Sequence, residues 1–459
     1  TKEGGLMEEA AKDFKEQTLF ELSWPLFIEI TLHMSMGILA TLILSSYSDL
    51  AVAGVGVANQ ILNIFILVFN VISIGATILI GQTIGAHRLD QARQIARSAI
   101  SFNFWSGIII ALIVFFFGNV FLRFYGLSGE VFQFASAYLK ITGLSLCLES
   151  LSLAFSAILR SHGFTKHAMV VTVIMNIISI TGNFIAVKGF FGLIPITGVT
   201  GVAISSCIAR LFVVLAFFYL VSKLLALKVE AKDLFRVPRS DIKNLLAIGV
   251  PSAGENLSYQ FSQIVITSFV AIMGDAALAA RVYILNISMF CYLFTSAVSQ
   301  GTQILVARYI GARQFSRALK RGIRTLKMAM FVSVIVSATI ALIGDRILNW
   351  FTHDPKIIAV ALPVLWAIIF IEPGRAMNIV LMGSLKSAGD VRFPVFIGVI
   401  CMWGVAVVFS YLFGIVLGLG LLGVWLAQGL DEWVRGIFAF KRWKSKPWEK
   451  IQPSVIQAK

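Results

Sequence analysis

Charged residues are scarce in this chain, and their scarcity excludes a soluble protein. Asp, Glu, Lys and Arg together make up 13% of the 459 residues, whereas a typical soluble domain carries about a quarter. Apolar residues make up 58%, and the mean hydropathy is +0.87. A soluble core cannot bury this much apolar surface, so lipid must surround most of the chain. The same composition excludes a disordered, collagen-like or disulfide-stapled protein.

Sequence features of metal, cofactor and nucleotide chemistry are also missing. The four cysteines lie far apart within apolar stretches, with neither metal-ligand spacing nor a disulfide framework. The sequence has no phosphate-binding loop, nucleophile elbow or zinc-binding HExxH motif. The net charge of +15 comes from short basic clusters between apolar runs, which argues against a nucleic-acid partner. We therefore expect no metal, no cofactor and no enzymatic activity.

Apolar runs long enough to cross a bilayer are abundant instead. A transmembrane helix needs about 20 apolar residues, and windows of about 19 residues identify the spans. Twelve runs qualify, at approximately 19–45, 51–82, 99–122, 131–158, 168–188, 197–226, 244–271, 278–306, 327–345, 357–385, 392–415 and 418–440. The sequence therefore predicts an all-α integral membrane protein with twelve transmembrane helices.

Basic residues concentrate in alternate loops. One set of loops carries Arg88, Arg93, Arg97, Arg160, Lys166, Lys223 to Lys243, Arg308 to Lys327, Lys386, Arg392 and the tail from Lys441. The other set carries only Arg123, Lys188, Arg281, Arg346 and Lys356. This asymmetry predicts a multi-pass protein of the plasma (inner) membrane with both termini in the cytoplasm. The tail run from Lys441 to Lys444, with Trp448, is typical of an interfacial anchor on anionic lipid.

The chain is an internal duplication with an offset of 226 residues. The offset aligns Pro25 and Glu29 with Pro251 and Glu255, and the run 84–86 with 310–312. After a slip of four residues, Gly198 and Gly201 align with Gly420 and Gly423. Two parallel repeats predict two pseudo-symmetric six-helix lobes around a central cleft. We assign 1–226 to the N-terminal lobe, 227–243 to a linker, 244–440 to the C-terminal lobe and 441–459 to a basic cytoplasmic tail.

Several stretches together resemble a known family. They are WPLFIEITLHMSMG (24–37), YSDLAVAGVGVANQI (47–61), GQTIGAHRLDQARQIA (81–96), GVPSAGENL (249–257), SLKSAGDVRFP (384–394) and DEWVRG (431–436). The chain resembles the multidrug and toxic compound extrusion (MATE) family over essentially its whole length, and its DinF-like and other bacterial members in particular. The resemblance implies a secondary efflux carrier driven by inward H⁺ or Na⁺.

Ionisable residues within apolar spans are functional candidates, because a charge at the bilayer centre is costly. Glu29 and Glu255 occupy equivalent depths in the first and seventh spans. Desolvation favours the protonated form of such a carboxylate, so each is a candidate ion-coupling site. Three polar residues follow Glu255 within about a turn, and we assign them to the substrate cleft: Asn256, Tyr259 and Gln260. The alternative is that each glutamate caps the start of its helix.

Glu372, Arg375 and Asn378 lie on one face of the tenth predicted span. Pro373 and Gly374 are expected to break the helix there. We assign Glu372 to ion coupling, and Arg375 and Asn378 to the substrate cleft. The alternative is a buried structural ion pair between two helices.

Glu149 is the remaining cleft candidate. The repeat places Arg375 at its equivalent position, and a Glu149–Arg375 salt bridge across the lobes is one hypothesis. Asp431, Glu432 and Arg435 are interpreted mainly as structural, with Arg210 as a conjectured partner of that cluster.

One departure from the family pattern affects the choice of ion. Ala40 stands where DinF-like relatives commonly carry an aspartate, and Asn183 fills an acidic position of the fifth span. The N-lobe aspartate mechanism is therefore not carried over. The C-terminal carboxylates also do not match the spacing of the cation site in NorM-like members. Carboxylates that look isolated in the sequence favour H⁺ over Na⁺.

These observations favour an ion-coupled antiporter that exports amphiphilic or organic-ion compounds by alternating access. The alternative is a lipid-linked oligosaccharide flippase of the same two-lobe architecture, but its cleft needs cationic residues and the first two spans have none in their apolar parts. A third hypothesis, a membrane-embedded enzyme or sensor, is not supported, because the sequence has neither a set of catalytic residues nor a soluble domain. We expect a monomer whose partners are a small-molecule substrate, H⁺ or Na⁺, and the lipid bilayer.

Overall fold

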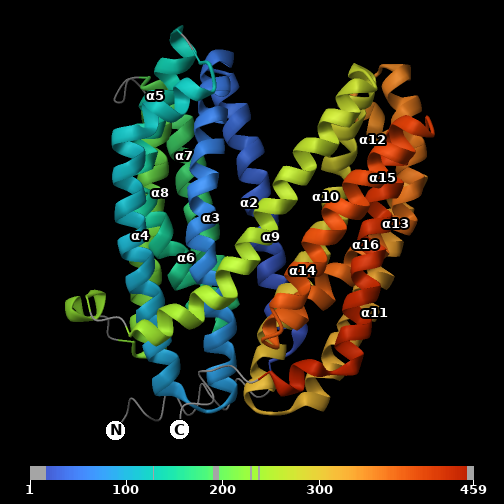
Figure 1. Cartoon of the computed structure of the whole chain (residues 1–459). Helices are drawn as coiled ribbons and strands as arrows, with labels where there is room; N and C mark the ends of the chain where they lie inside the picture. Colours follow the sequence, from blue (N-terminus) through green and yellow to red (C-terminus); the bar gives the residue numbers. More distant parts are fainter. Residues whose placement is uncertain (1–16, 128, 190–195, 228–229, 236–237, 452–459) are drawn as a thin grey trace. The chain divides into compact units, whose positions relative to one another are not determined.

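The computed structural model describes residues 17–127, 129–189, 196–227, 230–235 and 238–451, which form helices joined by short loops (Figure 1). No β-strand occurs within these ranges. The chain divides into two compact units. Unit 1 comprises Thr1–Ile84 and Arg88–Gly249, and unit 2 comprises Gly85–His87 and Val250–Lys459. The prediction of an all-α membrane protein is confirmed, while the exact lobe boundaries remain predictions.

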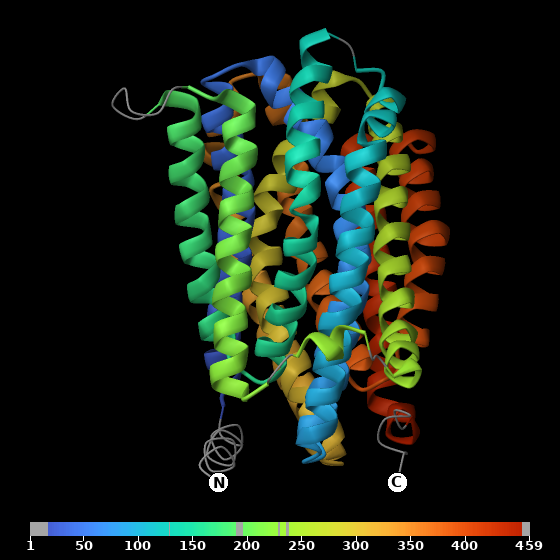
Figure 2. The same cartoon turned by 90° about the vertical axis from the view of Figure 1, so that its left-hand side faces the viewer.

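Unit 1 is a bundle of long helices that run side by side (Figure 2). They are α2 (Leu19–Ser45), α3 (Asp49–Gly85), α4 (Leu89–Phe124), α5 (Gly129–Leu144), α6 (Leu146–Ser161), α7 (Thr165–Lys188) and α8 (Gly198–Leu225). Thr18 and Glu21 form a capping box at the start of α2, which satisfies two backbone N–H groups at the helix terminus. Phe69, Leu122 and Leu139 are completely buried in the core of this bundle.

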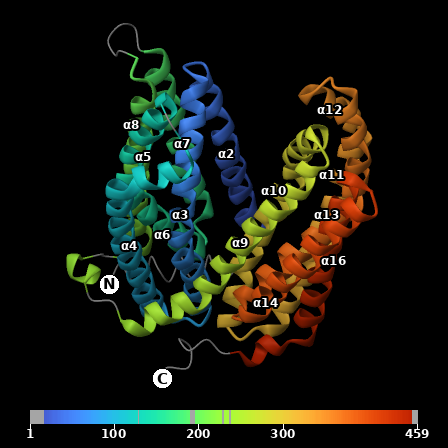
Figure 3. The same cartoon turned by 45° about the horizontal axis from the view of Figure 1, so that its top comes forward.

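Unit 2 contains most of α9 (Arg239–Ile272) and the helices that follow it. These are α10 (Asp275–Gly311), α11 (Phe315–Leu342), α12 (Gly344–Phe351), α13 (Pro355–Ser387), α14 (Arg392–Cys401), α15 (Val408–Tyr411) and α16 (Gly420–Ser445). The π-helical turns η2 (Met402–Val407) and η3 (Leu412–Val416) continue the α14–α15 span. Helix α13 is central, because it packs against α10, α11 and α16 (Figure 3).

Every predicted span coincides with a helix or with consecutive helices. Within the described ranges, nine helices are long and apolar enough to cross a membrane, and the bent pair α5–α6 provides a tenth. Helices α9 and α16 have 34 and 26 residues and are long enough to cross, at 1.5 Å of rise per residue. Polar residues such as Glu255 in α9 and Asp431 and Glu432 in α16 lower the hydropathy of these two helices.

Two backbone predictions were wrong. The fourth span, predicted as one helix, is broken between α5 and α6 with a bend of 49°. The tenth span, predicted to break at Pro373 and Gly374, is one continuous helix through both residues. Proline is tolerated inside a transmembrane helix when the surrounding helices fix the backbone, and α13 is held by three neighbours.

The described part of the predicted linker lies within unit 1 and packs against α4. Asp241 in the first turn of α9 accepts hydrogen bonds from Gln94 Nε2 at 3.0 Å and Ser98 Oγ at 2.8 Å. The short helix η1 (Ala231–Leu234) ends at Leu234, whose carbonyl oxygen accepts from Ser101 Oγ and Trp105 Nε1. The start of α9 is therefore anchored to α4.

The end of the chain and one predicted loop residue also differ from expectation. Trp448 was predicted to lie at the membrane interface, but its side chain is completely buried and stacks on Trp443 with ring centroids 4.6 Å apart. Arg281 was assigned to a loop, but it is 3% exposed and lies within α10. Its Nη2 donates to Gln263 Oε1 at 2.8 Å, and its Cζ lies 5.3 Å from the centre of the Trp425 ring.

Candidate functional site

Glycines allow α13 and α16 to pack closely. A Cβ on Gly374 would lie 2.7 Å from the Trp433 ring, and one on Gly436 would lie 3.0 Å from Met377. Trp433 Nε1 donates a hydrogen bond to the carbonyl oxygen of Phe370 at 2.9 Å. This close approach brings polar side chains of α13 and α16 into contact.

Those side chains form one network, which we call the α13–α16 cluster; its members are Glu372, Arg375, Asn378, Asp431, Glu432 and Arg435. Arg375 Nη1 donates to Glu372 Oε1 at 2.7 Å, one turn away on α13. Arg375 Nε also lies 3.6 Å from Glu432 Oε1. Asn378 Nδ2 donates to Glu432 Oε2 at 2.6 Å. Glu432 therefore connects the two helices.

The second half of the cluster lies on α16. Arg435 pairs with Asp431 one turn earlier, and its Nη2 lies 3.6 Å from Glu432 Oε1. Glu372, Asp431 and Arg435 are 2%, 3% and 5% exposed. Asp431 Oδ1 and Asn378 Oδ1 are buried and accept no hydrogen bond. Asp431 Oδ1 is thus available to a proton, and both oxygens are available to a cation.

The charges of the cluster do not balance. It contains three carboxylates, Glu372, Asp431 and Glu432, against the two guanidinium groups of Arg375 and Arg435. A buried charge without a partner is strongly unfavourable. The arrangement therefore favours uptake of one proton or one cation.

Unit 1 has a pair at the equivalent positions with the charges exchanged. Arg210 Nε lies 3.0 Å from Glu149 Oε2, and its Nη1 donates to Ser145 Oγ at 2.6 Å. The 226-residue offset aligns Glu149 with Arg375, and the slipped offset aligns Arg210 with Glu432. Glu149 pairs with Arg210 in unit 1, and Arg375 pairs with Glu372 and Glu432 in unit 2. A Glu149–Arg375 salt bridge across the lobes and a place for Arg210 in the cluster remain predictions.

Glu29 and Glu255 also have basic partners at matching positions. Arg160 pairs with Glu29, and Lys386 Nζ lies 2.5 Å from Glu255 Oε2. The offset aligns Arg160 with Lys386. The interpretation of these glutamates as isolated carboxylates is therefore wrong. Neither caps its helix, because α2 and α9 both begin well before them.

The remaining cleft candidates lie on α9, and Tyr259 among them interacts electrostatically with Arg375, Glu432 and Arg435 of the cluster. Asn256, Tyr259 and Gln260 are exposed on the surface of unit 2, with Tyr259 at 43%. No group of three or more potential metal ligands occurs among the described residues.

The sequence interpretation missed the basic partners, although it contained a signal for them. Arg160 and Lys386 were used only as loop charges that set topology. The repeat offset aligns Glu29 with Glu255 and Arg160 with Lys386. An acid and a base that both recur at equivalent positions of the two repeats predict an ion pair between them. After the four-residue slip, Arg210 likewise aligns with Glu432, while Glu149 aligns with Arg375. This exchange of acid and base at two positions also predicts a pair in each unit, and the sequence interpretation did not use it.

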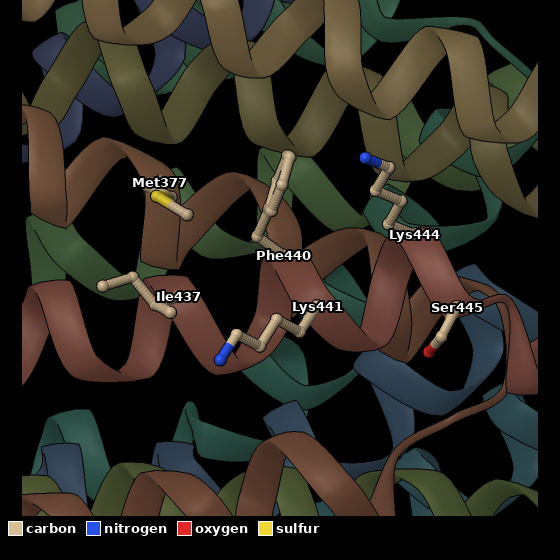
Figure 4. Close-up of a pocket in the computed structure, with 6 residues that line it drawn as sticks. All are labelled: Met377, Ile437, Phe440, Lys441, Lys444 and Ser445. Atoms are coloured by element: carbon tan, nitrogen blue, oxygen red, sulfur yellow. The ribbon is translucent and has the colours of Figure 1, made fainter.

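A cavity of about 470 Å³ lies beside the cluster, toward the end of α16 (Figure 4). Its lining residues are Met377, Ile437, Phe440, Lys441, Lys444 and Ser445. Met377 comes from α13 and the others from α16. The lining is apolar and basic, and it includes no member of the cluster.

The chain matches known proteins over most of its length. The MatE family model matches it twice, at residues 25–185 and 251–412. The chain is 43% identical over 447 residues to the transporter YisQ of Bacillus subtilis, covering 97% of each protein. It is 27% identical over 433 residues to a probable multidrug resistance protein, NorM, of Thermotoga maritima, covering 94% of this chain and 93% of that one.

Solved structures share the fold at low sequence identity. One is a transporter of the MOP superfamily from Pyrococcus furiosus, with a TM-score of 0.83, 19% identity and 96% of each chain covered. Another is an outward-facing multidrug resistance MATE family transporter, with a TM-score of 0.84, 19% identity and 96% of each chain covered.

Proposed function

Because the chain belongs to the MatE family of membrane transporters, we propose that it is an ion-coupled antiporter that exports amphiphilic or organic-ion compounds by alternating access. The coupled ion is H⁺ rather than Na⁺, and both termini lie in the cytoplasm. The multidrug resistance proteins among its relatives support the substrate class. The flippase alternative is not favoured by these relatives, and helices α2 and α3 contain no Lys or Arg.

The excess carboxylate of the α13–α16 cluster carries the proposal. Glu29 and Glu255 each have a basic partner, so neither retains an unbalanced charge. The cluster, by contrast, has one more acid than base. The coupling role predicted for Glu372 therefore extends to Asp431 and Glu432, while Arg375 and Asn378 orient the acids.

The same geometry supports H⁺ as the coupled ion. Hard cations in proteins are generally surrounded by about six or more oxygen ligands. The cluster offers only two buried oxygens without a hydrogen bond, Asp431 Oδ1 and Asn378 Oδ1. A proton needs one carboxylate oxygen. Protonation neutralises the excess charge while the unit is closed to water, and hydration of the cluster releases the proton in another conformation.

The test is efflux of the organic cation ethidium from proteoliposomes under an imposed pH gradient or an imposed Na⁺ gradient. The native protein should respond to the pH gradient and not to the Na⁺ gradient. Asp431→Asn should abolish the response, because the amide has the carboxylate's shape but exchanges no proton.

Asp345→Asn is the matched control, because Asp345 is an exposed acid of unit 2 outside the cluster. It should keep native efflux. Full pH-driven efflux by Asp431→Asn and Glu432→Gln would remove the cluster from the coupling mechanism, and efflux driven only by Na⁺ would overturn the choice of ion.

A further inference from the structure

The basic residues at the end of α16 fall into two groups. Arg442 Nε lies 2.8 Å from Asp390 Oδ2, and Lys446 Nζ lies 3.1 Å from Glu449 Oε1. Lys441 and Lys444 are exposed and form no ion pair with any described residue. Both of these unpaired lysines line the 470 Å³ cavity (Figure 4). At the end of α16, the two lysines without an ion pair are therefore the ones that line the cavity.

The cavity has an apolar part and a basic part, arranged along the helix. Ile437, Phe440 and Met377 lie toward the middle of the bundle, and Lys441, Lys444 and Ser445 lie toward the end of α16. A residue rise of 1.5 Å places Lys444 about 10 Å beyond Ile437 along the helix axis. An amphiphile that enters from the bilayer meets apolar side chains first and ammonium groups at its polar end.

The end of α16 is held rigidly, so the lysines are presented by a fixed scaffold. Trp443 and Trp448 are completely buried and stacked. The Trp443 ring packs against Gly322 of α11, where a Cβ would lie 2.7 Å from its Nε1. Phe315 at the start of α11 contacts the Trp448 ring at 6.1 Å between centroids.

We propose that this cavity is a binding site for an anionic phospholipid. The headgroup phosphate contacts the ammonium groups of Lys441 and Lys444. One acyl chain lies on Ile437, Phe440 and Met377. Charge complementarity selects the lipid class, because an anionic headgroup supplies the negative charge that Lys441 and Lys444 lack.

The site also has a route to the α13–α16 cluster. Met377, which forms part of the cavity wall, contacts Gly436 of α16 and lies between Arg375 and Asn378 in the sequence of α13. A bound lipid therefore supports the packing that holds the cluster together. This gives the proposed antiporter a dependence on anionic lipid.

The experiment measures thermal unfolding of the purified full chain in detergent with phosphatidylglycerol, phosphatidylcholine or inorganic phosphate added. Phosphatidylglycerol should raise the melting temperature more than phosphatidylcholine does. In the double variant Lys441→Gln/Lys444→Gln, the apparent phosphatidylglycerol affinity should fall about 25-fold, at about fivefold for each lysine. Lys441→Arg/Lys444→Arg should retain the preference, because arginine keeps the charge.

The matched control is Lys320→Gln/Lys327→Gln, which removes the same charge from two exposed lysines of α11 outside the cavity. It should keep the native lipid preference. Equal losses in the two neutral double variants would show attraction to surface charge alone and would overturn the site. Equal stabilisation by inorganic phosphate would overturn the lipid assignment. Binding is measured without transport, so failure of the antiport proposal leaves this result interpretable.

Discussion

The two units place ion pairs at equivalent positions of the duplicated chain but with exchanged charges. Glu149 meets Arg210 in unit 1, and Arg375 meets Glu432 in unit 2. At a given distance, attraction requires only that the two signs are opposite, so an ion pair can keep its position when both signs are exchanged. The unit 1 pair is balanced, whereas unit 2 adds two acids and one base around it. Equivalent positions therefore support a structural pair in one unit and an ion-coupling candidate in the other.

The backbones around these pairs differ as well. The fourth span of unit 1 is broken beside Ser145 and bends by 49° between α5 and α6. Its counterpart α13 is continuous despite Pro363 and Pro373. Arg210 donates to Ser145 Oγ and to the Thr142 carbonyl oxygen at the break, so the arginine satisfies backbone and side-chain acceptors there. Packing and hydrogen bonds, rather than the local presence of proline, therefore determine whether the helix bends.

The largest expected effect comes from reversing one charge in unit 1. Arg210→Glu places two carboxylates together and should destabilise the protein by about 3–5 kcal/mol. The double exchange Glu149→Arg/Arg210→Glu gives unit 1 the polarity of unit 2 and should recover about half of that loss, because the bonds of Arg210 to Ser145 and Thr142 stay broken. Thermal unfolding in detergent measures both. No recovery in the double variant would show that pair polarity is fixed by other groups.

Neutralising the acid of each pair should have different effects on stability in the two units. Glu149→Gln leaves Arg210 without a counter-charge and should cost about 3 kcal/mol, the low end of the range for a broken buried pair, because a quarter of the Glu149 side chain is exposed. Glu432→Gln removes the excess acid and should change stability by less than about 1 kcal/mol while ending pH-driven efflux. Equal destabilisation by the two variants would contradict the charge count on which the coupling proposal rests.

Gly374→Ala tests the close packing of α13 against α16 in unit 2. The added Cβ meets the Trp433 ring at 2.7 Å, and overpacking of this kind costs about 1–3 kcal/mol. The equivalent position in unit 1 is Leu148, so no such contact is required there. Gly254→Ala is the control, because a Cβ there has no neighbour within 4 Å, and it should be neutral or slightly stabilising. Equal melting temperatures for the two alanine variants would show that α13 and α16 can move apart without loss of stability, so that their close packing is not required.

The smallest effect is expected at the glutamates of the first helix in each unit. Thr172 Oγ1 lies 3.4 Å from Glu29 Oε1, and the equivalent residue facing Glu255 is Gly398. Thr172→Ala should therefore cost no more than about 1 kcal/mol, with efflux retained. A larger loss, or a change in the pH dependence of efflux, would give Glu29 a role that its pairing with Arg160 does not predict.

Much of the fold and part of the site follow from the sequence. Hydropathy located all twelve helices, and the offset identified Glu29 and Glu255 as twins and aligned Glu149 with Arg375. Glu372 and Arg375 were expected to pair because three residues separate them on a helix, and Arg375 Nη1 does donate to Glu372 Oε1. Glu432 was interpreted as structural, because nothing in its local sequence reveals that Arg375 and Asn378 lie opposite it.

The sequence by itself determined that the chain is an all-helical membrane protein built from two copies of one pattern. Hydropathy and repeat offset are local or additive properties, so they can be read without coordinates. Only the tertiary structure decided which charges meet, since Glu29 and Arg160, like Glu255 and Lys386, are 131 residues apart. It also decided that the α13–α16 cluster has one acid too many. Charge balance within a buried cluster depends on distances of a few ångströms between helices, and these are set by how Gly374 and Gly436 let the helices pack.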